Sequence, residues 1–270
     1  MSRLSTIAFI LIASLILSGC QQSRSKGLLN RFFEAKPLRV GMTLDAPPLT
    51  YRKDNLAAGL EMQFATGLAN SVERKLEVVE VPRDGMAKAL LDKKVDILMT
   101  GLTVADAQSQ KLTTTDPYLL SGQVALVHLD DYSLYGTGPR NLTSKNVRLG
   151  VVGESSGDVL LKGLGPKGHV TRYPTASEAV KALLADNIDV FLFDLPATAF
   201  YAAQYIDKGL TPGTALLTRE PLAWAVHPDD TKLRAAANDY LAALEQSGEL
   251  QKMLEQAIPF YRNTAYSPKQ

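Results

Sequence analysis

Short apolar runs alternate with amphipathic segments along most of this sequence. The runs predict three buried strands in the first part of the chain, over Leu38–Met42, Leu76–Val81 and Val95–Met99. Between the first two, Leu60, Phe64 and Leu68 recur at helical spacing and predict a helix over Gly59–Val72. A further helix is predicted from Asp84 to Leu91. Strands that alternate with helices in this way predict an α/β fold with mostly parallel sheets.

One segment of sixteen residues recurs 93 positions later. Ala87–Leu102 aligns without gaps on Val180–Leu195, with six identical positions. Each copy predicts a helix, a tight turn and a buried strand, so we expect two lobes of similar plan; convergence is the alternative, because any such unit needs apolar residues at these spacings. Ligands of open α/β sheets bind outside the carboxyl ends of strands. Gly101 and Asp194, which stand at equivalent strand ends, are therefore candidate ligand contacts.

The first residues predict export. A basic start, the apolar run Ile7–Leu17 and small residues after it are typical of a cleaved signal peptide, here residues 1–19. An uncleaved anchor is the alternative, but the run is shorter than the roughly 20 apolar residues of a membrane span. Leu17–Cys20 resembles a bacterial lipobox, which implies that Cys20, the one cysteine of the chain, carries lipid. Residues 20–37 would then form a polar tether.

Composition excludes several other functions. The net charge is +1, and 21% charged and 46% hydrophobic residues are typical of an ordinary globular protein. There is no basic stripe, so nucleic acid is not an expected partner. The three histidines are scattered, so we expect no metal and no other cofactor. Gly153–Gly157 superficially resembles a hydrolase nucleophile elbow with Ser155 as its serine, but that motif needs an acid and a histidine downstream, and Asp194 and His227 supply only their chain order, so we assign no catalytic residue.

From about Leu38 to Ile258 the chain resembles the family 3 extracellular solute-binding proteins, which are type II periplasmic binding proteins. The matching segments come in the family's order: Val40–Met42, Pro47–Tyr51, Gly59–Glu61, Val95–Ile97, Gly101–Val104, Asp116–Tyr118, Val151–Ser156 and Ile188–Asp194. The resemblance implies two α/β lobes, each a mostly parallel sheet flanked by helices, joined by a two-strand hinge. We expect lobe 1 over residues 38–127 and 222–262, lobe 2 over 128–221 and a tail over 263–270.

The resemblance also implies a ligand site. Amino-acid binders of this family hold the α-carboxylate with an arginine and hydroxyl groups, and the α-ammonium with an acid at the end of a lobe 2 strand. Those roles fall on Thr103, Ser155, Ser156 and Asp194. The arginine position holds Gln108, which can hydrogen-bond a carboxylate but cannot neutralise it. Ala46 and Arg83 stand where aromatic residues are usual, so Arg83 is a candidate for a relocated cation.

Each of these residues also has an ordinary structural interpretation. Asp194, Thr103 and Ser155 each precede a predicted helix and can serve as its N-cap. Arg83 can be a solvated surface residue beside Asp84. With Asp194 retained and the arginine lost, we expect a small polar solute that carries an amine, such as an amino acid, a derivative or a small peptide.

Three functions remain open. The first is a monomeric solute-binding lipoprotein outside the cytoplasm, which delivers its ligand to an ABC permease or to a sensor protein. The second is a regulatory lipoprotein that binds cell-wall fragments, because Pro48–Tyr51, Gly59–Glu61 and Pro221–Trp224 resemble the binding module of membrane-bound lytic transglycosylases. The third is a dehydratase of the same fold with Glu154 as proton donor. Gln21, which is not the aspartate that marks inner-membrane retention, favours an outer-membrane location.

Overall fold

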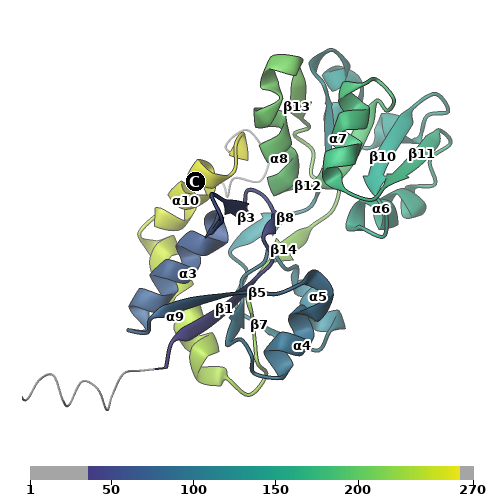
Figure 1. The fold of residues 1–270 in the computed structure, drawn as a ribbon. Coiled ribbons are helices and arrows are strands. Elements are labelled where there is room, and N and C mark those ends of the chain that lie inside the picture. Colours follow the sequence, from purple (N-terminus) through teal and green to yellow (C-terminus); the bar gives the residue numbers. More distant parts are fainter. Residues whose placement is uncertain (1–35, 262–270) are drawn as a thin grey trace, which may run out of the picture. The chain divides into compact units, whose positions relative to one another are not determined.

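The computed structural model describes residues 36–261 (Figure 1). The predicted signal peptide, Cys20, most of the tether and the tail lie outside this range. Within it, no helix is both long enough and apolar enough to cross a membrane.

The first sheet is built from two distant parts of the chain. Its strand order is β5-β1-β6-β15-β7, and the strands span Leu76–Glu80, Leu38–Met42, Ile97–Leu98, Ala225–Val226 and Thr113–Thr114. β1 pairs in parallel with β5 and β6, whereas β15 runs antiparallel to β6 and β7. The three predicted strands are confirmed, although the third forms ladder pairs only at Ile97 and Leu98. The C-terminal part of the chain supplies β15 and thus returns to this sheet.

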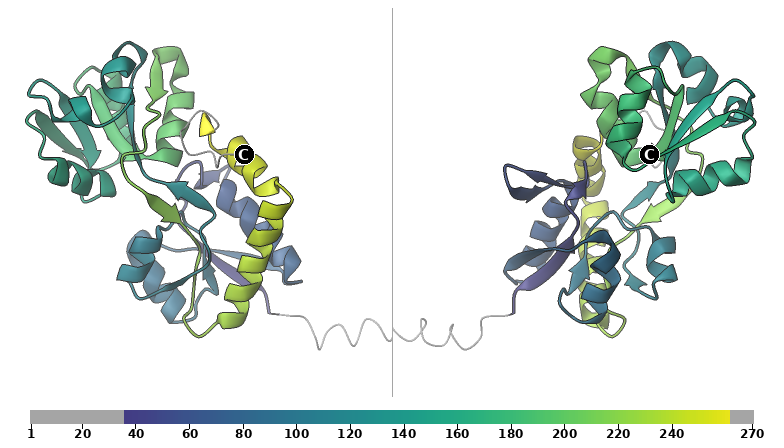
Figure 2. Two further views of the ribbon diagram at one scale, coloured as in Figure 1. Left: turned by 180° about the vertical axis from the view of Figure 1, so that it is seen from behind. Right: turned by 45° about the vertical axis from the view of Figure 1, so that its right-hand side comes forward.

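Helices from both parts share one apolar core on this sheet. α3 (Leu60–Ser71) packs with α9 (Thr231–Gln246) and α10 (Glu249–Ala257), side by side in Figure 2. The predicted helix after Asp84 forms as a 3-10 turn, η1 (Arg83–Gly85), followed by α4 (Met86–Leu91). A small antiparallel sheet of β2 (Asp45–Ala46), β3 (Thr50–Lys53) and β4 (Leu56–Ala58) precedes α3. α5 (Val104–Ser109) follows β6.

The second sheet repeats the plan of the first. Its order is β11-β10-β12-β9-β13, and the strands span His169–Tyr173, Arg148–Val152, Val190–Asp194, Gln123–His128 and Leu210–Pro212. β10 pairs in parallel with β11 and β12, and β9 runs antiparallel to β12 and β13. Three helices accompany it: α6 (Ser156–Leu164), α7 (Ala176–Leu184) and α8 (Leu195–Gln204). The two-lobed α/β architecture predicted from the sequence is therefore the architecture observed.

The internal repeat has a structural cause. Asp96 accepts hydrogen bonds from the backbone N and the guanidinium of Arg39 at the start of β1, at 3.1 and 2.5 Å. Asp189 accepts the same two kinds of bond from Arg148 at the start of β10, at 2.7 Å from the backbone N. Each aspartate thus fixes the strand that it opens to the neighbouring parallel strand, β1 in the first sheet and β10 in the second. The turn before each aspartate contains a residue with positive φ, Lys93 at 56° and Asp186 at 54°.

Two antiparallel strands connect the sheets. β8 (Leu119–Ser121) pairs with β14 (Glu220–Leu222), which matches the expected two-strand hinge. The chain passes into the second lobe before Val127, where the sequence analysis had ended the first part of lobe 1, because β9 lies in the second sheet between β12 and β13. Val124–Val127 is an apolar run buried on both faces, and such a run fits the middle of either sheet. After β14, which ends at Leu222, the chain returns to the first sheet through β15.

Candidate functional site

Asp194 ends β12 and caps α8. Its Oδ1 accepts a hydrogen bond from the backbone N of Ala197 at 3.0 Å. Burial raises the pKa of this carboxyl to about 6; the bond from Ala197 opposes that rise, the negative charge of Glu220 adds to it, and Arg83 lowers the pKa. Asp194 is therefore mostly ionised at neutral pH, and a ligand cation would stabilise its charge. The capping role is observed, and contact with a ligand stays a prediction.

The loop after β6 places Gly101 and Thr103 by separate contacts. Gly101 has a φ of 67°, and a Cβ added there would lie 2.7 Å from Leu49 Cδ1, so this position requires glycine. Its backbone N donates to Glu61 Oε1 at 2.9 Å. Thr103 is the N-cap of α5, and its Oγ1 accepts from the backbone N of Asp106 at 3.0 Å. That bond leaves the hydroxyl hydrogen of Thr103 for another acceptor.

Glu61 supports this loop and was given no role from the sequence. Its side chain is fully buried, and it receives hydrogen bonds from Gly101 N, Tyr118 Oη at 2.5 Å and Trp224 Nε1 at 2.8 Å. Burial raises the pKa of Glu61 to about 7, while the three donors lower it. The acid therefore links α3 to the loop after β6, to the segment before β8 and to the sole tryptophan of the chain.

The start of α6 carries the two predicted hydroxyls of the second lobe. Ser155 is the N-cap: its Oγ accepts from Asp158 N at 3.3 Å and donates to the Val152 carbonyl at 2.7 Å. Ser156 is exposed. Asp158 is buried at this helix start, and hydrogen bonds from Arg172 and Lys162 lower its pKa to about 2. The chain therefore places its own carboxylate at the anion-attracting end of α6.

The two candidates for holding a carboxylate lie in exposed settings. Gln108 is exposed on α5. The Arg83 side chain is 59% exposed and forms an ion pair with Asp45 of β2 at 3.1 Å. Ala46 is the next residue of β2, and it brings no aromatic ring to this edge. The structure thus gives Arg83 a protein partner before any ligand is considered.

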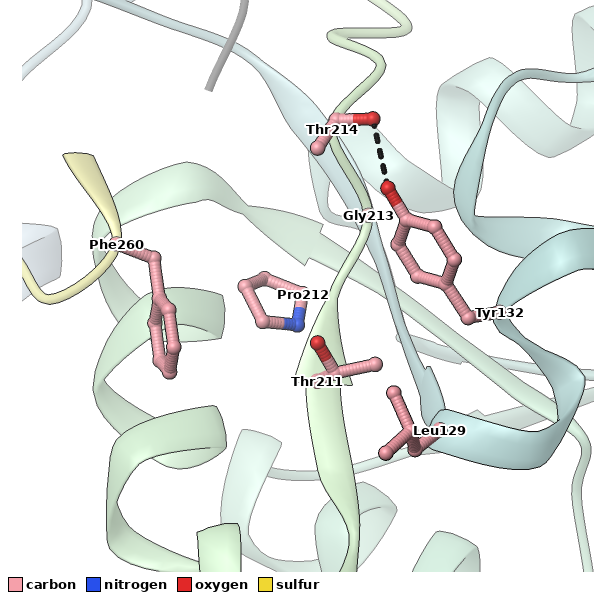
Figure 3. A pocket seen from close by; sticks show the side chains of 7 residues that line it. All are labelled: Leu129, Tyr132, Thr211, Pro212, Gly213, Thr214 and Phe260. Atoms are coloured by element: carbon pink, nitrogen blue, oxygen red, sulfur yellow. Dashed lines mark hydrogen bonds between the residues drawn. The ribbon is translucent and has the colours of Figure 1, made fainter. Parts of the chain in front are cut away.

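A pocket of about 320 Å³ lies elsewhere, along β13. Figure 3 shows its lining, which comes from Leu129, Tyr132, Thr211, Pro212, Gly213, Thr214 and Phe260. Tyr132 Oη and Thr214 Oγ1 are 3.1 Å apart and hydrogen-bonded. No charged side chain and none of the predicted ligand residues line this pocket. It therefore offers no partner for a charged ligand.

No group of three or more histidine or acidic residues within residues 36–261 is arranged to hold a metal ion. Glu154, the proton donor of the dehydratase hypothesis, is exposed and has a φ of 62°. Its backbone N points to Asp158 Oδ2 at 3.4 Å.

Comparison with known proteins supplies the context of this geometry. The model of bacterial extracellular solute-binding proteins, family 3, matches residues 38–259. The chain is 27% identical over 231 residues to the L-cystine-binding protein TcyJ of Escherichia coli strain K12, covering 85% of each chain. It is 24% identical over 276 residues to the cyclohexadienyl dehydratase of Pseudomonas aeruginosa, covering 97% of this chain and 95% of that one.

A solved structure extends the likeness to the fold. The ancestral cationic amino acid solute-binding protein AncCDT-1 superposes with a TM-score of 0.76 at 26% identity, covering 86% of this chain and 99% of that chain.

Proposed function

Because the chain belongs to family 3 of the bacterial extracellular solute-binding proteins, we propose that it closes its two lobes on a small, polar, amine-bearing solute. Asp194 carries the proposal, since it is an acid at the end of a lobe 2 strand whose charge burial disfavours. A ligand ammonium would stabilise that charge by pairing with it. The complex would serve ABC import or sensing outside the cytoplasm.

The proposed ligand presents no buried carboxylate. Gln108 is neutral and exposed, the start of α6 already holds Asp158, and Arg83 is paired with Asp45. An unpaired carboxylate in such a site would be costly. The carboxylate of the solute is therefore absent, amidated or left in solvent.

Calorimetry with the twenty amino acids, their amides, small dipeptides and cell-wall peptides tests this proposal. We expect binding of at least one amine-bearing compound, with amides bound at least as tightly as free acids. Small-angle scattering with that compound should give a smaller radius of gyration, because the ligand stabilises the closed state. Failure of every compound to bind would contradict the proposal.

Arg83→Ala should change the dissociation constant of the ligand by no more than about fivefold, because an exposed arginine that is paired with Asp45 contributes little to the free energy of ligand binding. Arg52→Ala, which removes an exposed arginine paired with Glu80 in the same lobe, is the matched control. Titration calorimetry of both variants with a free acid and its amide measures the effect. A much larger loss for the acid alone would show that Arg83 holds a ligand carboxylate.

We also propose a lipid anchor at Cys20, which lies outside the described residues. Buried acyl chains contribute about 0.8 kcal/mol per CH₂, and two chains suffice for stable anchoring. Cys20→Ala should move the protein from the membrane fraction to the soluble fraction of cells. Retention of the variant in salt-washed membranes would contradict this anchor.

The cell-wall regulator and the dehydratase have less support than solute binding. The cell-wall regulator gains support from Gln108 and from the resemblance to the transglycosylase module, and the cell-wall peptides in the calorimetric panel test it. For the dehydratase, exposed Glu154 lacks the enclosed setting that raises the pKa of a catalytic acid.

A further inference from the structure

Glu220 lies in the hinge and is held there by neutral donors. It belongs to β14, and its Oε1 accepts from Thr218 Oγ1 at 2.7 Å. Its Oε2 accepts from Gln123 Nε2 at 3.2 Å. Thr218 Oγ1 in turn accepts from the backbone N of Gln123 at 2.7 Å. These bonds fix the carboxylate in place without neutralising its charge.

Gln123 joins this acid to the candidate ligand site. It is directly opposite Asp194 in the antiparallel pairing of β9 with β12, so the two side chains lie on one face of the sheet. Its amide also holds Glu220, so the two acids flank one glutamine. The charge of Glu220 acts on Asp194, raising its pKa. Two like charges at such a place repel each other unless a cation lies between them.

Two buried polar atoms at the same place have no hydrogen-bond partner among residues 36–261. Ser121 is 1% exposed and directly opposite Glu220 in the hinge pairing, and its Oγ is unpartnered. Gln123 is 3% exposed, and its Oε1 is unpartnered. Buried polar atoms in native proteins are nearly always satisfied. The amide oxygen of Gln123 can only accept a hydrogen bond, and the hydroxyl of Ser121 can accept as well as donate, so a ligand donor would satisfy both atoms.

We propose that Glu220 and Asp194, with Ser121 and Gln123 between them, form a second cationic subsite at the hinge. This inference rests on the proposed function and narrows its ligand class to solutes with two protonated nitrogen groups. One group pairs with Asp194, and the other donates to Glu220 and its neighbours. Because β14 connects the lobes, this second contact forms on the hinge itself.

Four ligands of similar size test the two charges separately. L-lysine and L-lysinamide carry two ammonium groups, whereas L-norleucine and L-norleucinamide carry one. Calorimetry should give dissociation constants on the order of tenfold smaller for the lysine compounds than for the norleucine compounds. Comparing the two amides with the two free acids tests the separate claim that the site does not bind a ligand carboxylate.

Glu220→Gln should remove the preference for the second ammonium, because the amide keeps the size of the side chain but not its charge. Glu220→Asp, which keeps the charge, should restore part of it. Glu178→Gln, the same change at an exposed position of α7, is the control and should leave all four constants unchanged. Thermal unfolding of each variant establishes that it is folded.

The outcomes separate the two proposals. Equal affinities for lysinamide and norleucinamide in the wild-type protein would overturn the hinge subsite and leave the amine-binding function intact. A preference for lysinamide that persists in a folded Glu220→Gln variant would also overturn it. No binding of any of the four, or of any compound in the wider panel, would overturn the proposed function.

Discussion

Asp194→Asn is expected to weaken ligand binding by about 1.5–3 kcal/mol, roughly 10- to 150-fold in the dissociation constant. Asparagine keeps the oxygen that accepts from Ala197 N, so α8 remains capped while the charge is lost. Titration calorimetry of both proteins with the same ligand measures the difference.

Asp230→Asn is the matched control for this change. Asp230 is also half-buried, and it caps α9 through a 3.0 Å bond to Leu233 N, at a helix to which no ligand role is assigned. The control should bind as the wild type does. Equal affinities for all three proteins would show that Asp194 is only a helix cap.

The affinity of the wild-type protein should also fall with acidity. The pKa of Asp194 is about 6 without ligand, so its carboxylate becomes protonated as the pH falls from 7 to 5. A protonated acid cannot pair with an ammonium, so the dissociation constant should rise over this interval. The Asp194→Asn variant should show a much flatter profile.

Glu61 should make the folded state less stable as the pH rises. Its pKa is about 7 in the folded protein, against an ordinary value of 4.5 for a glutamate side chain, so the folded state binds more protons than the unfolded state between those two pH values. Stability therefore falls as pH increases through this interval, by roughly 3 kcal/mol in total. Glu61→Gln removes the titration, so the free energy of unfolding of the variant should lack this decline.

Urea unfolding at several pH values between 5 and 8 measures this effect. The fluorescence of Trp224 is a direct probe, because it is the sole tryptophan and its Nε1 donates to Glu61 Oε2. Glu178→Gln, at an exposed position, should keep the wild-type slope. Parallel profiles for the wild type and Glu61→Gln would mean that Glu61 stays ionised throughout.

Local patterns were enough to predict much of this fold. The helical spacing of Leu60, Phe64 and Leu68 predicted α3, and the repeat of Ala87–Leu102 predicted two sheets of one plan. The repeated aspartates were visible in the sequence, but their arginine partners were not, since Arg39 and Asp96 are 57 positions apart. β9 was not predicted as a strand, and its residues were assigned to lobe 1, because an apolar run buried on both faces fits either sheet.

Local patterns also indicated some of the candidate site residues. Asp194 and Gly101 were proposed because they stand where predicted strands end, and such ends are evident from sequence. Glu61 was not assigned, because its three donors lie 40, 57 and 163 positions away in the chain. The pairing of Arg83 with Asp45 and the position of Glu220 beside Gln123 are likewise tertiary contacts that no local pattern encodes.

Native mass spectrometry of the protein purified from cells tests the central claim most directly, because it requires no prior choice of ligand. We expect the wild-type protein to carry a small molecule of defined mass that is lost on denaturation and contains at least one amine. The Asp194→Asn variant should carry much less of it, and Asp230→Asn should carry the same amount. A bound molecule without an amine, or one retained equally by the Asp194→Asn variant, would contradict the account.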